Sequence, residues 1–318
     1  MKYMIAMDSG GTKTESVLVD ETGHILARDV TAGANGLEVG LETALERISA
    51  ACYRLYRQLP AGENLSAIYG GVAACADYFP GAMENQLYPM LPPSERMRFE
   101  GDGGCLIGAV MGHQDGACII SGTGSSLYIR NGDKLQLFGG WGYLIDTEGS
   151  GYTIGRDAFL AAFRSLDGRG PKTVLYDLIG QQLGGPPETK LPQIYQGGRP
   201  CIASFAGTVF AARKMGDGEA IRIFDHAVTR LADLLRVGAR ELKKPFQVVL
   251  GGGLFAAFPE LWEAVKDQAP AEATPVLLKQ RPILGAAVEA RYEAGLPDDP
   301  AFRETFTRDY EALTAAGK

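Results

Sequence analysis

Two short turns of similar composition contain the residues best suited to bind phosphate. Residues 8–14 (DSGGTKT) and 121–125 (SGTGS), named here the first and second glycine loops, each follow an apolar run. Glycine lets the backbone approach an anion closely, while N–H groups and hydroxyls donate hydrogen bonds to phosphate oxygens. A hairpin turn that only joins two strands could have the same composition, so either loop alone leaves both interpretations open. Together they predict a clamp for a polyphosphate.

The elements expected around the loops occur in the same order in both halves of the chain. The first half is expected to contain strands at 2–8, 15–19, 25–30, 65–72 and 97–100 and helices at 37–59 and 104–111. The second half is expected to contain strands at 117–121, 126–130, 135–138, 247–250 and 275–279, with helices elsewhere. This repetition predicts two α/β domains, residues 1–115 and 116–318, that face each other across a cleft.

Composition limits the class of partner. The 318 residues are 46% hydrophobic and 22% charged, with a net charge of −7, as in a globular protein. The negative charge argues against nucleic acid or an anionic membrane as partner and favours a small molecule. The N-terminal segment has no apolar leader pattern, so we expect a cytoplasmic protein. The five cysteines are widely spaced and are expected to be reduced core residues.

Further motifs carry a resemblance to a known superfamily. Residues 101–104 (GDGG) and 249–253 (VLGGG), with the two glycine loops, resemble the acetate and sugar kinase, Hsc70 and actin superfamily. Residues 33–35 (GAN), 139–142 (GGWG) and 148–152 (EGSGY) resemble the branch of N-acetylglucosamine kinases and BadF-type ATPases within it. The resemblance covers the whole chain in the expected order. It implies two ribonuclease H-like domains, which form the actin-like ATPase fold.

The resemblance implies a role for individual residues. Asp8 would hold Mg²⁺ through water, although an aspartate can also simply start a turn. Asp102 would be the general base, although aspartate is also a good helix cap. The implied phosphate-binding residues are Ser9, Gly10, Gly11, Thr12, Lys13, Gly122, Thr123, Gly124 and Ser125. The implied adenosine-binding residues are Ala206, Gly207, Gly251, Gly252 and Gly253. The implied sugar-binding residues are Asn35, Asp102, Gly140, Trp141, Gly142, Thr147 and Glu148.

Several of these roles have plain structural alternatives. Lys13 could be solvated surface, and Trp141 could be a core aromatic residue. Glu148 could cap a helix that begins near residue 149, and the glycine triplet 251–253 could be a loose connection.

One position departs from the family pattern. Relatives usually have Gly-Asp-Glu-Gly-Ser where this chain has Asp146, Thr147 and Glu148 before Gly149 and Ser150. A hydroxyl at position 147 cannot fully replace a carboxylate that accepts hydrogen bonds from sugar hydroxyls. Either Asp146 supplies the charge, or the substrate differs from plain N-acetylglucosamine.

The expected protein is an ATP- and Mg²⁺-dependent kinase that phosphorylates a hydroxyl, the 6-hydroxyl first, of an N-acetylhexosamine. N-acetylglucosamine is the leading substrate, with N-acetylmuramate or glucosamine as alternatives, and a homodimer is left open. A rival hypothesis is a BadF-like ATPase activator, but those proteins carry paired cysteines for an iron–sulfur cluster. A third is a sugar sensor without catalysis, against which the retained Asp102 argues.

Overall fold

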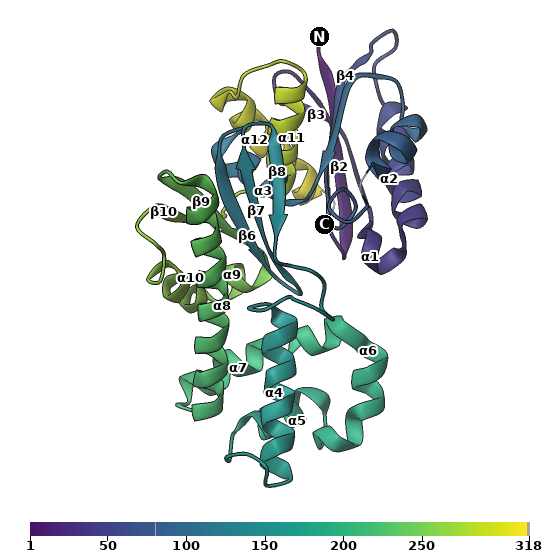
Figure 1. The fold of residues 1–318 in the computed structure, drawn as a ribbon. Coiled ribbons are helices and arrows are strands. Elements are labelled where there is room, and N and C mark those ends of the chain that lie inside the picture. The colour runs from purple at the N-terminus through teal and green to yellow at the C-terminus, as the bar shows by residue number, and fades with distance from the viewer. Residues whose placement is uncertain (80, 317–318) are drawn as a thin grey trace. The chain divides into compact units, whose positions relative to one another are not determined.

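The computed structural model describes residues 1–79 and 81–316, which form two compact units (Figure 1). The first unit comprises Met1–Gly116, Tyr128–Leu137 and the C-terminal segment from Leu278, and the second comprises Ala117–Leu127 and Phe138–Leu277. The first unit therefore contains the C-terminal helices as well as the N-terminal segment. The predicted domain boundary at residue 116 was based on two related halves of the fold, whereas these two units are defined by their compactness. The boundary therefore stays a prediction.

The first unit contains a five-stranded sheet with the order β3-β2-β1-β4-β5. Neighbouring strands are antiparallel from β3 to β1 and parallel from β1 to β5, so the central strand β1 is buried from both faces. Its strands are β1 (Tyr3–Ser9), β2 (Lys13–Asp20), β3 (Ile25–Ala32), β4 (Leu65–Val72) and β5 (Ser94–Glu100).

Helices cover both faces of this sheet. The apolar face of α2 packs on β2 and β3, while α3 and α11 pack on the sheet from the other side (Figure 1). The single helix expected at 37–59 is wrong, because Gly40 adopts a φ of +82° and separates α1 from α2. The helices of this unit are α1 (Gly36–Val39), α2 (Leu41–Tyr56), a π-helical turn (Met83–Leu87), a 3₁₀ turn (Tyr88–Met90), α3 (Gly103–Met111), α11 (Pro282–Glu293) and α12 (Pro300–Ala316).

A second five-stranded sheet has the order β10-β9-β6-β7-β8, with β6, β9 and β10 parallel. Its last strand lies at residues 273–277 and not at the expected 275–279. The strands are β6 (Gly116–Ser121), β7 (Ser125–Asn131), β8 (Lys134–Phe138), β9 (Phe246–Gly251) and β10 (Ala273–Leu277).

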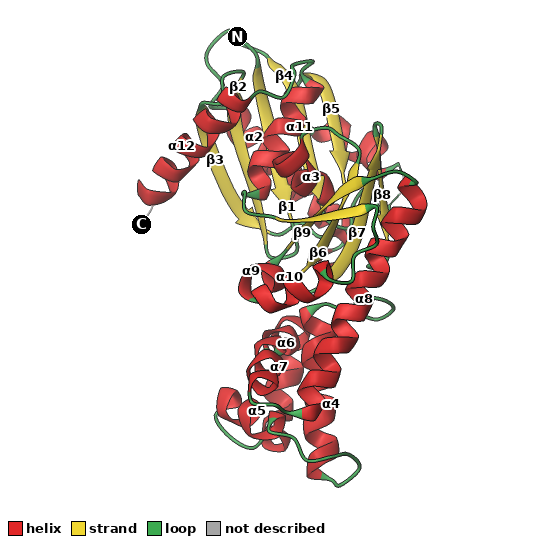
Figure 2. Cartoon of the chain, turned by 90° about the vertical axis from the view of Figure 1, so that its left-hand side faces the viewer, coloured by secondary structure: helices red, strands yellow, loops and turns green. Residues whose placement is uncertain are grey.

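Most of the second unit is helical, as expected. Helices α4 to α8 pack against one another and form a bundle (Figure 2). The helices of this unit are α4 (Gly151–Leu166), α5 (Leu175–Leu183), a 3₁₀ turn (Pro187–Lys190), α6 (Leu191–Ser204), α7 (Ala206–Lys214), α8 (Gly218–Leu242), α9 (Gly253–Ala257) and α10 (Pro259–Lys266). Among the described helices, none combines the length and the apolar character needed to cross a bilayer.

Candidate active site

The first glycine loop connects β1 to β2 and is braced from within. The Ser9 hydroxyl is buried and lies 2.7 Å from the Thr14 hydroxyl, while the Gly10 amide donates to the Lys13 carbonyl at 3.0 Å. Thr12 is exposed at the tip, and the Lys13 ammonium pairs with Glu15 at 2.6 Å. Of the two predicted hydroxyl donors, Thr12 therefore faces solvent, whereas Ser9 holds the turn in shape.

The segment that contains Asn35 lies directly against this loop. A Cβ on Gly33 would stand 2.2 Å from the Gly11 carbonyl oxygen, so only glycine fits this approach of the two backbones. The Asn35 side-chain oxygen accepts a hydrogen bond from the Leu37 amide at 3.0 Å and caps α1. Its predicted contact with sugar stays a prediction.

Asp102 stands between β5 and α3, with glycine on both sides. It occupies the N-cap position of α3 but makes no capping hydrogen bond, so the plain capping role is not observed. Burial, with a smaller contribution from the nearby carboxylates of Asp8 and Asp77, raises the pKa of its carboxyl to about 7, and an interaction with Tyr128 opposes this shift. A carboxyl that titrates near neutral pH is suited to act as a general base.

Asp77, which was not predicted from the sequence, belongs to this group. The Tyr128 hydroxyl donates to Asp77 Oδ2 at 2.8 Å, and burial raises the Asp77 pKa to about 6 despite that bond. The only sequence signal was an acidic residue shortly after the buried strand β4. Its relation to Asp102 depends on Tyr128, which is distant in sequence.

Asp8 ends β1 beside the first loop. The pKa of its carboxyl is raised to about 7, chiefly by burial, with Lys13 opposing the shift and Glu15 contributing to it. A bound cation would favour the ionised form of such a carboxyl, so the residue fits the predicted role toward Mg²⁺. Within residues 1–79 and 81–316, no three His, Cys, Asp or Glu side chains gather to bind a metal directly. One carboxylate with bridging waters is a common arrangement for Mg²⁺, and this assignment stays a prediction.

The second glycine loop connects β6 to β7 and is held by its surroundings. Its Gly122 carbonyl accepts from the Gly151 amide of α4 at 2.7 Å. The buried Ser125 hydroxyl donates to the Glu148 carbonyl at 2.7 Å, and the Ser125 amide donates to the Thr147 hydroxyl at 2.9 Å. Thr123 is exposed at the tip. As in the first loop, one hydroxyl faces solvent and another braces the turn.

The glycine triplet lies next to the second loop. Gly252 adopts a φ of +101°, and a Cβ there would stand 2.4 Å from the Ser121 carbonyl oxygen. A Cβ on Gly122 would lie 3.6 Å from the Gly253 amide. The triplet is therefore a close crossing of two backbones and not a loose connection. Ala206 is buried at the start of α7, with Gly207 next to it; their adenosine-binding roles and those of Gly251, Gly252 and Gly253 stay predictions.

Residues 139–149, named here the tryptophan loop, follow β8. Gly139, Gly140 and Gly142 all adopt positive φ, a conformation that favours glycine. Trp141 is 54% exposed, so it is not a core residue. Helix α4 is capped by Ser150, and so Glu148 is not its cap.

Thr147 differs from the other predicted sugar residues in its surroundings. Its side chain is buried, with 5% exposed, and its hydroxyl is bound to the second loop. This contact gives Thr147 a structural role that the sequence did not suggest. A sugar contact for Thr147 stays a prediction.

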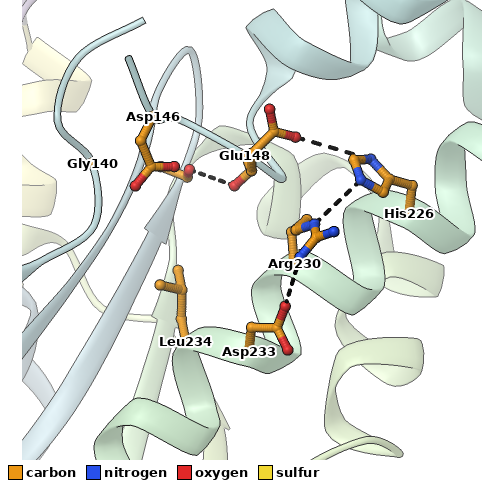
Figure 3. Close-up of a pocket in the computed structure, with 8 residues that line it drawn as sticks. Gly140, Asp146, Glu148, His226, Arg230, Asp233 and Leu234 are labelled. Carbon is orange, nitrogen blue, oxygen red and sulfur yellow. Dashed lines mark hydrogen bonds and ion pairs between the residues drawn. The ribbon is translucent and has the colours of Figure 1, made fainter.

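A cavity of about 450 Å³ lies beside the tryptophan loop, within the second unit. Figure 3 shows the Glu148 carboxylate facing His226, at 3.9 Å, and Arg230 between His226 and Asp233. Two predicted sugar residues, Gly140 and Glu148, line this cavity, whose volume would accommodate a monosaccharide. Its full lining is Ser125, Gly140, Asp146, Glu148, His226, Arg230, Asp233 and Leu234.

Comparison with known proteins identifies relatives along most of the chain. An N-acetylmuramic acid/N-acetylglucosamine kinase from Clostridium acetobutylicum is 30% identical over 240 residues, which are 73% of this chain and 77% of that protein. An N-acetyl-D-glucosamine kinase from Dictyostelium discoideum is 27% identical over 273 residues, 79% of this chain and 85% of that protein.

Solved structures agree with these relatives. A structure from Chromobacterium violaceum, provisionally named an N-acetylglucosamine kinase, has a TM-score of 0.69 and 25% identity and covers 90% of this chain and 98% of its own. The fold of a ROK family glucokinase from Streptomyces griseus matches with a TM-score of 0.54 at 19% identity, covering 91% of this chain and 99% of its own. These similarities confirm the predicted α/β class and the actin-like ATPase fold.

The family assignment follows from the length of the match. The family model of the BadF/BadG/BcrA/BcrD ATPases matches residues 5–290. This range includes both glycine loops, Asp102, the tryptophan loop and the glycine triplet. The resemblance predicted from these motifs is confirmed, and the chain belongs to the BadF/BadG/BcrA/BcrD ATPase family.

Proposed function

We propose that this protein is an ATP-dependent kinase that transfers a phosphoryl group to a hydroxyl of an amino sugar. The observation that carries the proposal is the Asp102 carboxyl, which is bordered by glycines and has a pKa raised to about 7. The names of the curated relatives, which are amino-sugar kinases, support this class of substrate. N-acetylglucosamine and its 6-hydroxyl are the first candidates, followed by N-acetylmuramate and glucosamine.

The proposed mechanism assigns a task to each part of the chain. Asp102 accepts the proton of the attacking sugar hydroxyl, which makes that oxygen a better nucleophile. Thr12, Thr123 and the amides of the glycine loops would orient the phosphates, and Asp8 would hold the metal through its bound water. Mg²⁺-ATP, when bound, supplies the phosphoryl group and a metal charge that balances the phosphate oxygens. Glycines 251–253 leave room for the nucleoside, and Asn35, Trp141 and Glu148 bind the sugar.

An ADP-release assay over hexoses, hexosamines and N-acetylhexosamines tests this function. We expect release that depends on an amino sugar, with the phosphorylated position read from NMR of the product. The Asp102→Asn variant should retain binding but turn over at least about a hundredfold more slowly, because a lost general base commonly costs that much. Release of ADP that no sugar stimulates would instead favour an ATPase activator. A cytoplasmic location remains part of the proposal.

A further inference from the structure

Three polar side chains of the first unit, those of Asp102, Tyr128 and Asp77, form a series that begins at the candidate base. The Tyr128 hydroxyl donates to Asp77 Oδ2 at 2.8 Å, and Tyr128 is also the side-chain hydrogen-bond partner that lowers the pKa of Asp102. The tyrosine ring lies across the backbone on both sides of Asp102. A Cβ on Gly101 would stand 2.8 Å from the Tyr128 hydroxyl oxygen, and one on Gly103 would stand 2.3 Å from the ring.

The number of protons shared by Asp102, Tyr128 and Asp77 limits the directions that their hydrogen bonds can take. A phenol has one O–H to donate, and its oxygen can accept a second hydrogen bond. When Tyr128 donates to Asp77, its bond with Asp102 requires that Asp102 carry a proton. When Asp102 is ionised, Tyr128 must donate to it instead. Protonation of Asp102 and the direction of the Tyr128 hydroxyl are therefore coupled.

On the basis of the proposed kinase function, we propose that Tyr128 and Asp77 relay the sugar's proton from Asp102 toward solvent. The sugar O–H bond breaks as an O–H bond to Asp102 forms. The Asp102 proton then moves to the Tyr128 oxygen while the original Tyr128 proton moves to the Asp77 carboxylate. This leaves Asp102 ionised, Tyr128 neutral and Asp77 protonated, and Asp77 finally releases the proton to water.

The position of Asp77 suits the last step. Asp77 is partly exposed and lies in the segment after β4, outside both glycine loops. Asp102 lies near Asp8, the residue proposed to hold the metal, and its proton would otherwise have to leave past bound substrates. The relay returns Asp102 to its ionised form for the next turnover.

The relay can be tested with Asp77→Ala and Tyr128→Phe, using the sugar that wild type phosphorylates fastest. We expect kcat to fall about tenfold or more in each, as part of the 10²–10⁴ typical of acid–base catalysis, while both KM values stay within about twofold. Sodium formate, a small carboxylate, should restore kcat in Asp77→Ala, whereas sodium chloride at equal ionic strength should not. A residue that only supports the fold would show no such rescue.

Tyr176→Phe is the matched control, because Tyr176 also donates to a carboxylate, Glu188 Oε2 at 3.0 Å, but lies in the helical part of the second unit. It should leave kcat unchanged. Wild-type turnover in Asp77→Ala, or a loss that formate does not restore, would overturn the relay and leave the kinase assignment intact. If Asp77→Ala does not fold, normal kcat in Tyr128→Phe overturns the relay. Absence of sugar phosphorylation by the wild type would instead reject the proposed function, and the relay with it.

Discussion

Replacing Thr147 with valine distinguishes a role in holding the second glycine loop from a role in binding the sugar. The side chain is buried, and its hydroxyl accepts the Ser125 amide of the second glycine loop at 2.9 Å. Valine has nearly the same shape but no acceptor, so this amide would be left without a partner. An unpaired buried donor costs about 1 to 3 kcal/mol, which corresponds to roughly 5- to 150-fold in an equilibrium constant.

The cost should appear in nucleotide binding. Loop conformations in which the Ser125 amide reaches water would become populated, and ATP binding would have to restore the ordered loop. We therefore expect the KM for ATP to rise within roughly 5- to 150-fold, while the KM for the sugar stays within about twofold. Thr147→Ser keeps the acceptor and should retain wild-type kinetics. Initial rates measured over both substrates give the two constants.

The opposite result would refute this account. If Thr147→Val raises the KM for the sugar and leaves that for ATP unchanged, residue 147 faces the sugar, as the family pattern suggested. A melting temperature close to that of wild type would show that neither result comes from unfolding.

Four further outcomes are expected. Since the pKa of Asp102 is raised to about 7 and the base must be ionised, a pH–rate profile should show kcat/KM for the sugar rising about tenfold per pH unit below this value and levelling above it. The same shift means that Asp102 binds its proton more tightly in the folded state, so its contribution to the free energy of unfolding should fall between pH 3.8 and about 7 in urea titrations. Gly122→Val should raise the KM for ATP more than that for the sugar, because the side chain would enter the space beside the Gly253 amide, whereas Gly218→Val, which enters open space, should not. Arg130→Met should lower the free energy of unfolding by about 3 to 5 kcal/mol, because Arg130 is fully buried and its loss would leave Glu100, 2.6 Å away, without this partner.

Local patterns were enough to predict the elements that carry the loops. The turn at residues 8–14 lies between β1 and β2, as expected, because a continuous apolar run followed by glycines determines this hairpin within a short stretch of chain. The break of the first helix at Gly40 was missed, although an isolated glycine is the usual local signal for it.

Pairs that meet only in the folded chain could not be predicted in this way. Tyr128 and Asp77 are 51 residues apart, and Ser125 and Thr147 are 22 apart. Neither tyrosine in a strand nor threonine in a loop is unusual by itself. Their roles arise from strand order and loop packing, which no short window of sequence contains.

Within the second unit, three hydrogen bonds connect the tryptophan loop to the second glycine loop. The Ser121 hydroxyl donates to the Gly149 carbonyl at 2.8 Å, and the Ser125 hydroxyl donates to the Glu148 carbonyl at 2.7 Å. The Thr147 hydroxyl adds a third link through the Ser125 amide. Because two of these links end on main-chain carbonyls, they are independent of the side chains at 148 and 149. The threonine at 147 therefore strengthens a connection that two serine hydroxyls already make. If the proposed roles are correct, a change in the tryptophan loop is expected to alter the position of the phosphates.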